Sequence, residues 1–223
     1  MEKVRIIEIK QSVFESNEKE ADKLRAYLKE KGVYLINLMS SPGSGKTTTL
    51  LKTLSMLKDK LRIAVMEADI DSDVDAIKIK DSGIESIQLH TGGMCHLDAM
   101  MTRQGLDNLD LDNLDLVILE NVGNLVCPAE FDTGACKNVM ILSTPEGDDK
   151  PLKYPLMFQV TNLVLINKID VKDYFNFSME RVEENVRLRN KNVEIMPISA
   201  KTGENIDKFA DWILKEVKDW QSK

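Results

Sequence analysis

A glycine-rich loop between an apolar run and a helix-forming run constrains the fold more than any other feature. The apolar run at 33–39 is followed by SSPGSGKT at 40–47, and TTLLKTLSML comes next. This strand–loop–helix order turns backbone N–H groups and a helix N-terminus toward a phosphate. A helix-capping Gly/Ser turn would have a similar composition, but the GKT triplet in this context favours a nucleoside triphosphate. The expected binding residues are Gly43, Ser44, Gly45, Lys46, Thr47 and Thr48.

Two side chains of this loop have expected chemical roles. Lys46 can reach the β- and γ-phosphate oxygens, and the hydroxyl of Thr47 can ligate Mg²⁺. Ser40 stands where such loops usually begin with glycine, so the first residue of the loop must adopt a conformation that accommodates a Cβ.

Short apolar runs rich in β-branched residues alternate with helical patterns along the whole chain. Such runs are typical of strands buried on both faces of a mostly parallel sheet. We therefore predict an α/β fold with three layers, a doubly wound sheet of the P-loop NTPase (GTPase) type, in a single domain over 1–223. A helix over about 17–31, ended by Gly32, is expected to pack on it. The predicted strands are 33–39, 62–68, 86–90, 115–120, 138–142, 163–167 and 193–198.

Composition excludes several classes of partner. The 223-residue chain has a formal net charge of −7, which disfavours nucleic acid because phosphate contacts need clustered Lys and Arg. No apolar run approaches the ~20 residues of a membrane span, and the N-terminus lacks the apolar core of a signal peptide. Three cysteines do not make a secreted disulfide framework. We expect a cytoplasmic protein.

Two short elements after predicted strands indicate which base is bound. Asn167-Lys168-Ile169-Asp170 resembles the NKxD element of GTPases, in which the carboxylate accepts hydrogen bonds from guanine N1 and N2. Adenine cannot supply these donors, and an unpaired buried acceptor costs about 1–3 kcal/mol. Four residues alone could be a polar strand end. Ser199-Ala200-Lys201 resembles the SAK loop that contacts guanine from the other side, and together the two elements favour GTP.

Carboxylates at two further strand ends are candidates for the switch. Glu120-Asn121-Val122-Gly123 resembles the DxxG switch with Glu in place of Asp, so Glu120 can hold Mg²⁺ while the Gly123 N–H senses the γ-phosphate. In the acidic segment 67–75 we favour Asp69 and Asp75 as the pair that positions Mg²⁺ or the attacking water. Asp71 and Asp73 fit solvated helix-capping residues better.

All three cysteines and both histidines lie between residues 90 and 136. Cys95 and His96 are adjacent in a glycine-rich loop, and Cys127 follows the switch segment closely. Thiolate and imidazole suit Zn²⁺ or Ni²⁺, but buried free cysteine is common, so spacing alone leaves both a metal site and simple packing open. Three ligands cannot close a tetrahedral site. Cys136 and His90 fit structural roles.

The motifs, taken in order, resemble those of one protein family. SPGSGKTT, EADIDSDVDA, TGGMCHLDAM, LENVGNLVCPAEFDTG, NKIDV and ISAKTGE closely resemble the HypB family, GTPases that help insert nickel into [NiFe]-hydrogenases. The resemblance covers nearly all of the chain after residue 30. It places the chain in the dimeric branch of P-loop GTPases that includes UreG and MeaB. One departure is the N-terminus, which has neither the cysteine-rich nor the histidine-rich nickel motif of many HypB proteins.

The resemblance implies a metallochaperone whose metal site is coupled to the nucleotide switch. Cys95, His96 and Cys127 become ligands for Ni²⁺ or Zn²⁺, Lys46 acts on the phosphates, and Thr47, Asp75 and Glu120 serve Mg²⁺. The implied partners are a second copy in a GTP-favoured homodimer, other hydrogenase maturation proteins and the hydrogenase large subunit. No arginine finger or water-positioning Gln is evident, so GTP hydrolysis is expected to be slow.

Two alternatives remain open at this stage. The first is a GTPase that gates cofactor loading of a urease-type or cobalamin-dependent enzyme, with thiols that only pack. The second is an ATP-dependent small-molecule kinase, which nucleotide competition would distinguish.

Overall fold

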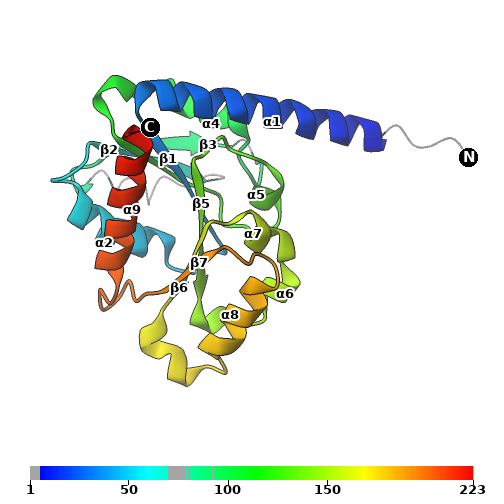
Figure 1. Ribbon diagram of the computed structural model, residues 1–223, viewed down its shortest axis with the longest axis vertical. Coiled ribbons are helices and arrows are strands. Elements are labelled where there is room, and N and C mark those ends of the chain that lie inside the picture. Colours follow the sequence, from blue (N-terminus) through cyan, green and yellow to red (C-terminus); the bar gives the residue numbers. More distant parts are fainter. Residues whose placement is uncertain (1–5, 70–78, 80, 92, 223) are drawn as a thin grey trace, which may run out of the picture.

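The computed structural model describes residues 6–69, 79, 81–91 and 93–222 of the 223-residue chain. Within this part the strands form one seven-stranded parallel sheet in the order β3-β2-β4-β1-β5-β6-β7 (Figure 1). The strands are β1 (Tyr34–Ser40), β2 (Ile63–Asp69), β3 (Glu85–His90), β4 (Leu116–Glu120), β5 (Lys137–Ser143), β6 (Leu163–Asn167) and β7 (Glu194–Pro197).

Helices connect these strands. They are α1 (Ile6–Lys31), α2 (Lys46–Leu57), α4 (Ala99–Leu106), α5 (Cys127–Glu130), α6 (Lys150–Lys153), α7 (Pro155–Val160), α8 (Met179–Arg187) and α9 (Ile206–Gln221). Three short 3₁₀ turns accompany them, η1 (Leu111–Asn113), η2 (Thr144–Glu146) and η3 (Ile169–Tyr174). No helix in the described ranges combines the length and the apolar character that crossing a membrane requires.

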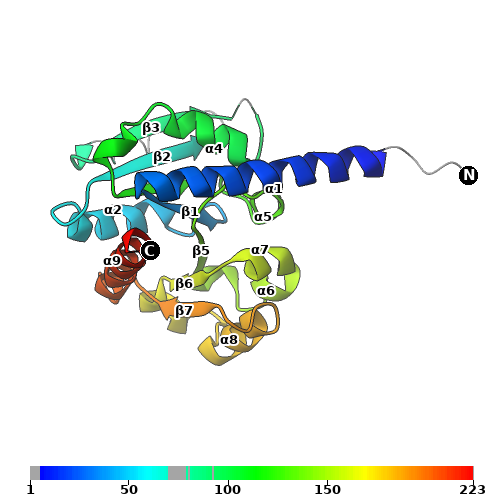
Figure 2. The ribbon, with the colours of Figure 1, turned by 45° about the horizontal axis from the view of Figure 1, so that its top comes forward.

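Buried apolar side chains lie on both faces of the sheet, as expected for parallel strands. On one face, α2 and α9 pack together over side chains such as Ile36, Ile118 and Ile141. The opposite face is covered in two parts. Helices α1 and α4 lie over β1, β2 and β4, whereas α7 and α8 lie over β5 and β6. Figures 1 and 2 show α1 crossing the molecule beside α4, with its amino-terminal part projecting past the other helices.

The fold agrees with the sequence prediction except at the first helix. All seven predicted strands are present, with ends that differ by a few residues, and the three-layer α/β fold is confirmed. The predicted start of the first helix near Asn17 was wrong, because α1 begins at Ile6. The segment before Asn17 contains no glycine or proline that would end a helix. Its end was predicted correctly: α1 stops at Lys31, and Gly32 has a φ of 69°.

The strand register brings the predicted motifs to one edge. Glu120 pairs with Leu38 near the carboxyl end of β1, and Asn167 pairs with Ser143 at the end of β5. Ligands of open parallel sheets bind at this edge. The nucleotide motifs therefore meet where the topology predicts.

Candidate functional site

The phosphate loop connects β1 to α2 in a conformation that depends on glycine. Gly43 and Gly45 have φ angles of 74° and 99°. A Cβ on Gly45 would lie 2.6 Å from the side-chain nitrogen of Asn167, so this position also needs the missing side chain for close packing. Ser40 ends β1 and is fully buried; its hydroxyl donates to the Ser41 carbonyl at 2.8 Å. Serine is accommodated because Ser40 continues the strand.

Three predicted phosphate and magnesium residues converge at the start of α2. The Glu120 carboxylate at the end of β4 is 4% exposed. Its Oε1 lies 3.4 Å from the Thr47 hydroxyl and 3.8 Å from Nζ of Lys46. A carboxylate and a hydroxyl are hard oxygen ligands of the kind Mg²⁺ prefers, so the residues present fit this ion. Lys46 stands beside them to meet phosphate oxygens.

The predicted carboxylates of the acidic segment are only partly placed. Asp69 is the last residue of β2, which puts its backbone at the carboxyl edge beside the strand of Glu120. Asp71, Asp73 and Asp75 lie outside the described residues. The assignment of Asp69 and Asp75 to Mg²⁺ or water therefore stays a prediction.

Gly123 lies against the phosphate loop. A Cβ on Gly123 would be 3.3 Å from Cγ and 3.4 Å from the backbone nitrogen of Pro42. The segment following β4 is also fixed to β1, since the Asn121 N–H donates to the Leu38 carbonyl at 2.9 Å. The segment after β4 is therefore packed closely against the phosphate loop at Gly123 and hydrogen-bonded to β1 at Asn121.

The predicted base-reading elements form a connected pocket. Asn167 is buried; its side chain donates to the Ser44 carbonyl at 2.9 Å and accepts from the Ala200 N–H at 3.0 Å. Nζ of Lys168 donates to the Gly43 carbonyl at 2.7 Å, and the Ser199 hydroxyl donates to Asp170 at 2.6 Å. A pocket of about 210 Å³ is lined by Gly45, Thr48, Asn167, Lys168, Asp170, Val171, Ala200 and Lys201.

Sequence reasoning missed one residue that holds this region. The Glu146 carboxylate accepts from the N–H and the hydroxyl of Ser143, both at 2.8 Å, and it also accepts from the hydroxyl of Ser41. It therefore ties the phosphate loop to the end of β5. The S-x-x-E spacing of Ser143 and Glu146 is a capping-box signal, so the sequence could have predicted the contact between these two residues but not the one with Ser41.

The loops that carry the predicted metal ligands come together within one chain. The Cys127 thiol lies beside the Cys95 thiol, and hydrogen bonding to Cys95, ahead of burial, raises the pKa of Cys127. The ring of His96 stacks on Phe131, with centroids 3.8 Å apart and planes at 12°. Burial lowers the pKa of His96, and no residue that the structure describes offers a hydrogen-bond partner to its buried Nδ1. Phe131 was not predicted, because nothing in the sequence links it to His96.

The thiol pair is not a closed metal cage. Across the described part of the chain, no three His, Cys, Asp or Glu side chains gather closely enough to hold a metal ion. Exposed apolar side chains flank the pair: Met94 is 41% exposed and Val126 is 51% exposed. His90 and Cys136, for which structural roles were expected, are not part of this thiol pair. His90 is exposed at the end of β3, and burial raises the pKa of Cys136 to about 11.

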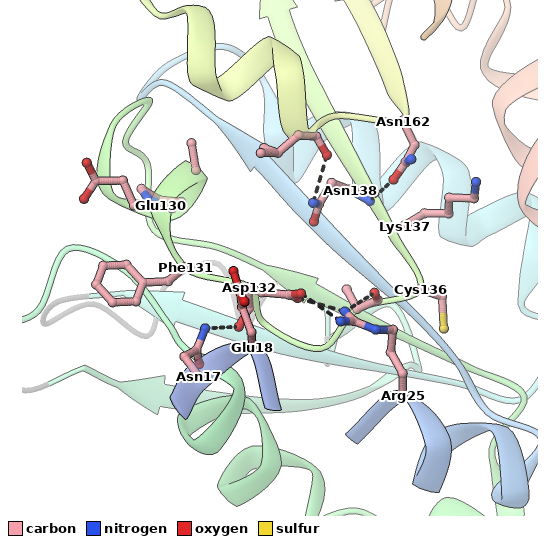
Figure 3. Close-up of a pocket in the computed structure, with 14 residues that line it drawn as sticks. Asn17, Glu18, Arg25, Glu130, Phe131, Asp132, Cys136, Lys137, Asn138 and Asn162 are labelled. Atoms are coloured by element: carbon pink, nitrogen blue, oxygen red, sulfur yellow. Dashed lines mark hydrogen bonds and ion pairs between the residues drawn. The ribbon is translucent and has the colours of Figure 1, made fainter. Parts of the chain in front are cut away.

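A larger cavity lies on the α1 side of the sheet. It encloses about 480 Å³ between α1, the segment after Cys127 and the amino ends of β5 and β6 (Figure 3). Charged and amide side chains line it, among them Asn17, Arg25, Asp132, Lys137 and Asn138. Sequence motifs gave no indication of this cavity, because its walls come from segments far apart in the chain.

Comparison with known proteins gives consistent matches. A family model described as the CobW/HypB/UreG nucleotide-binding domain matches residues 34–197. The hydrogenase maturation factor HypB of Escherichia coli is 44% identical over 213 residues, covering 96% of this chain and 73% of the relative. The hydrogenase/urease maturation factor HypB of Helicobacter hepaticus is also 44% identical, covering 97% and 90%. The crystal structure of Helicobacter pylori HypB in complex with nickel has a TM-score of 0.86 and 38% identity, covering 92% of this chain and 96% of that one.

Proposed function

Since the chain belongs to the CobW/HypB/UreG family of nucleotide-binding proteins, we propose that it is a GTP-hydrolysing metallochaperone that delivers nickel during hydrogenase maturation. The predicted membership of the HypB group and the P-loop GTPase class are confirmed by these comparisons. The finer assignments below, of residues, partners and location, are our proposals, as is the treatment of 1–223 as one domain.

One observation carries the proposal. The segment 121–127, from the end of β4 to the first residue of α5, lies close to the phosphate loop at Gly123 and beside the Cys95 thiol at Cys127. A change at the γ-phosphate can therefore reach a sulfur ligand through a short stretch of backbone. This contact supports a metal site whose affinity depends on the bound nucleotide.

The nucleotide chemistry follows from the residues at the carboxyl edge. Lys46 and the N-terminus of α2 would stabilise negative charge on the transferred phosphoryl group. Thr47 and Glu120 would hold Mg²⁺, which neutralises charge on the β- and γ-phosphate oxygens. Asp170 would accept the guanine N1 and N2 protons, with Ser199, Ala200 and Lys201 on the other side of the base. Loss of the γ-phosphate would release Gly123 from its contact with Pro42.

Nickel is the cargo in this proposal. Two thiolates and an imidazole from Cys95, Cys127 and His96 suit Ni²⁺ and also Zn²⁺. The unpartnered Nδ1 of His96 supports a ligand role for this ring. Because no three such groups gather in the described part of one chain, His96 would have to approach the thiols, and further ligands would come from water or from a second copy. The exposed Met94 and Val126 beside the thiols support a homodimer at this surface.

The relatives also bear on the partners. The Escherichia coli relative is a hydrogenase maturation factor, whereas the Helicobacter hepaticus relative is a hydrogenase/urease maturation factor. We propose other hydrogenase maturation proteins and the hydrogenase large subunit as partners in the cytoplasm. A urease is the second candidate acceptor, favoured by the name of the Helicobacter relative.

The test is a nickel titration in two nucleotide states. Nickel affinity should differ about tenfold or more between the GDP form and the form with a non-hydrolysable GTP analogue. Cys95→Ala with His96→Ala should abolish stoichiometric binding, whereas Cys136→Ala, a matched thiol control, should leave it unchanged. Equal affinity in both nucleotide states would disprove the coupling. Unchanged stoichiometry in the double variant would favour thiols that only pack, and ATP displacing GTP with equal affinity would favour a kinase.

A further inference from the structure

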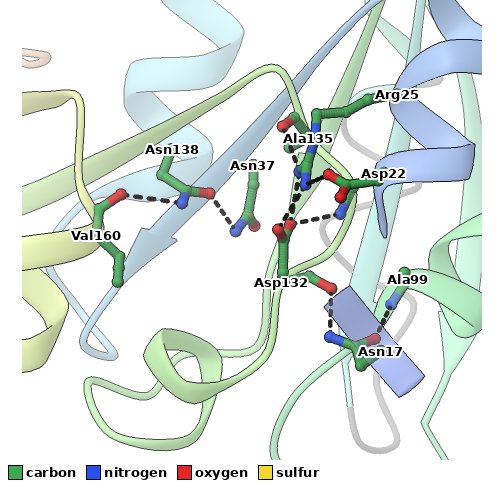
Figure 4. Close-up of polar contacts among 10 residues, drawn as sticks. Asn17, Asp22, Arg25, Asn37, Ala99, Asp132, Ala135, Asn138 and Val160 are labelled. Carbon is green, nitrogen blue, oxygen red and sulfur yellow. Dashed lines mark hydrogen bonds and ion pairs between the residues drawn. The ribbon is translucent and has the colours of Figure 1, made fainter. Parts of the chain in front are cut away.

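The side chain of Asn17 bridges two segments that are far apart in the sequence. It lies in α1 and is only 8% exposed. Its Nδ2 donates to the carbonyl of Asp132 at 2.9 Å, and its Oδ1 accepts the backbone N–H of Ala99 at 3.0 Å (Figure 4). Both hydrogen-bonding ends of the amide are therefore used, one toward each segment.

Ala99 and Asp132, the two residues that Asn17 binds, lie within a few residues of the predicted metal ligands in the chain. Ala99 is the first residue of α4, and the loop with Cys95 and His96 leads into this helix. Its N–H is one of those that a helix leaves without an internal partner, so Asn17 satisfies a group that otherwise needs water. Asp132 follows α5, which begins at Cys127. The Asn17 amide thus links the loop that contains Cys95 and His96 to the segment that begins at Cys127.

A second residue of α1 fixes the same anchor. Arg25 binds both carboxylate oxygens of Asp132, at 2.9 and 2.8 Å, and the Asp132 carboxylate also accepts the Gly134 N–H at 2.8 Å. A bidentate pair of this kind sets direction as well as distance. Hydrogen bonding to Asp132 raises the pKa of Arg25, so the guanidinium stays charged. These hydrogen bonds hold Asp132 in a defined position relative to α1, where its carbonyl accepts from Asn17.

The stacked rings close the gap between the loops on the ligand side. His96 belongs to one loop and Phe131, next to Asp132, to the other. The loops are therefore joined twice, by the ring pair near the thiols and by Asn17 behind it. Both contacts link segments that are far apart in the sequence, and the one through Asn17 requires α1 to be packed in place.

We propose that Asn17 is a positioning residue for metal binding: it holds the Cys95–His96 loop and the Cys127 segment at the spacing that keeps the Cys95 and Cys127 thiols together, so that both can bind one ion. The inference rests on the proposed function, since it names what sets the geometry of that site. Asn17 touches neither the nucleotide motifs nor the thiols. Its loss should change metal binding and leave GTP binding intact.

The experiment compares Asn17→Ala with Asn185→Ala in the full chain. Asn185 is a matched control, because its side chain also donates to a backbone carbonyl, that of Asp148 at 2.9 Å, but on the α8 side of the molecule. Nickel sulfate is titrated against a competing chelator while the thiolate-to-nickel absorption is recorded. We expect Asn17→Ala to weaken nickel binding about tenfold and to shift the absorption, in the range typical of residues that orient ligands. Asn185→Ala should match the wild type.

A metal-free readout measures the spacing of the thiols directly. In a glutathione buffer, Cys95 and Cys127 form a disulfide as one oxidised glutathione is reduced to two glutathione thiols, so the equilibrium reports their effective concentration. Asn17→Ala should lower this equilibrium constant about tenfold. Asn17→Asp, which keeps the acceptor for Ala99 but loses the donor to Asp132, should fall between. Binding of a fluorescent GTP analogue verifies that each variant is folded.

The outcomes separate the two claims. If the wild type shows no thiolate-to-nickel absorption, the proposed function fails. If the wild type shows it and Asn17→Ala equals the wild type in both nickel affinity and disulfide equilibrium, the positioning role is overturned. Parallel losses of nickel and GTP binding in Asn17→Ala and Asn17→Asp would also overturn it, because they would show a general structural effect.

Discussion

The nucleotide pocket and the thiol-bearing loops are held in place in different ways. In the pocket, Asn167 bonds to Ser44 and Ala200, and Lys168 bonds to the loop carbonyl of Gly43. These contacts join strand ends that the sheet already places together. The thiol loops have no such frame, because both leave the sheet. They are joined by a ring stack and by side chains of α1.

This difference separates a site that the sheet preorganises from one that a neighbouring helix adjusts. A guanine pocket fixed by buried hydrogen bonds can select its base before any conformational change. The thiol pair lies on more exposed segments, where small shifts change the distance between ligands. Such a division suits a switch, in which one region must stay constant while the other responds.

The largest effect is expected from Asp170→Asn. The Asp170 carboxylate would accept hydrogen bonds from the guanine N–H groups, whereas the amide of Asn would place its own NH₂ donor against them. GTP affinity should therefore fall about 100- to 1,000-fold. The Ser199 hydroxyl can still donate to the amide oxygen, which preserves the loop. Titration with a fluorescent GDP analogue measures the loss, with Asp173→Asn of the same 3₁₀ turn as control. The nickel affinity of the nucleotide-free protein should not change. An equal loss of nickel affinity would show that the nucleotide pocket and the thiol loops are not independent.

The nucleotide region was also the part that the sequence predicted best. Its motifs have local backbone requirements, such as the positive φ of Gly45, and parallel strands bring their ends together automatically. The near-continuous apolar runs located all seven strands, because strands buried on both faces of a parallel sheet need apolar side chains at almost every position. Helix α1 was placed only in part, because its amphipathic pattern, and not a capping signal, was used to find its start.

The thiol region was predicted by residue type but not by contact. Cys95, His96 and Cys127 were grouped as metal ligands through the resemblance to the HypB family, and that grouping stays a prediction. The structure places the two thiols side by side, but no three such side chains gather among the described residues. The joins through Phe131 and Asn17 could not be read, because each links segments whose spacing is set only by tertiary packing. Asp75 remains a prediction, since it lies outside the described residues.

The second prediction concerns the reactivity of Cys136, a half-buried thiol that packs against the core. Burial raises the pKa of Cys136 from an ordinary 9.0 to about 11, so at pH 8 its thiolate fraction should be about 100-fold lower than that of a free thiol. Iodoacetamide labelling followed by peptide mass spectrometry should modify Cys136 at least that much more slowly than a model thiol. In denaturant all three cysteines should label alike. If Cys136 in the folded chain were labelled as fast as the model thiol, the raised pKa of Cys136 would be contradicted.

The third prediction concerns the packing of α1 on the thiol-bearing segment. Gly134 has a φ of 76°, and a Cβ there would lie 2.7 Å from Cδ2 of Leu24 in α1. Gly134→Ala should cost about 2–3 kcal/mol in the free energy of unfolding, from backbone strain and from this clash. Gly83→Ala is the control, because Gly83 has a similar φ of 85° with open space around it, so only the strain of about 1–2 kcal/mol applies. Urea unfolding measures both, and equal losses would show that Leu24 moves aside without cost.

The smallest effect is expected at the opposite edge of the sheet, where neither region is touched. Asp115 binds Arg62 at 2.8 Å just before β4, and the hydrogen bond from Arg62 lowers the pKa of Asp115 below its ordinary 3.8. A carboxyl group whose pKa is lower in the folded protein stabilises the fold above its unfolded pKa, and that contribution is lost as the pH falls through the folded value. Asp115→Asn should therefore lower the melting temperature by about 1–2 °C at pH 7, since water screens the pair. The difference from wild type should shrink below pH 3.8 and disappear in stronger acid. Circular dichroism melts across this range measure it, with the exposed Asp211→Asn of α9 as control. If Asp115→Asn also altered GTP or nickel affinity, a general loosening of the sheet would affect the nucleotide pocket and the thiol loops. The difference between the two regions could then no longer be explained by the contacts within each.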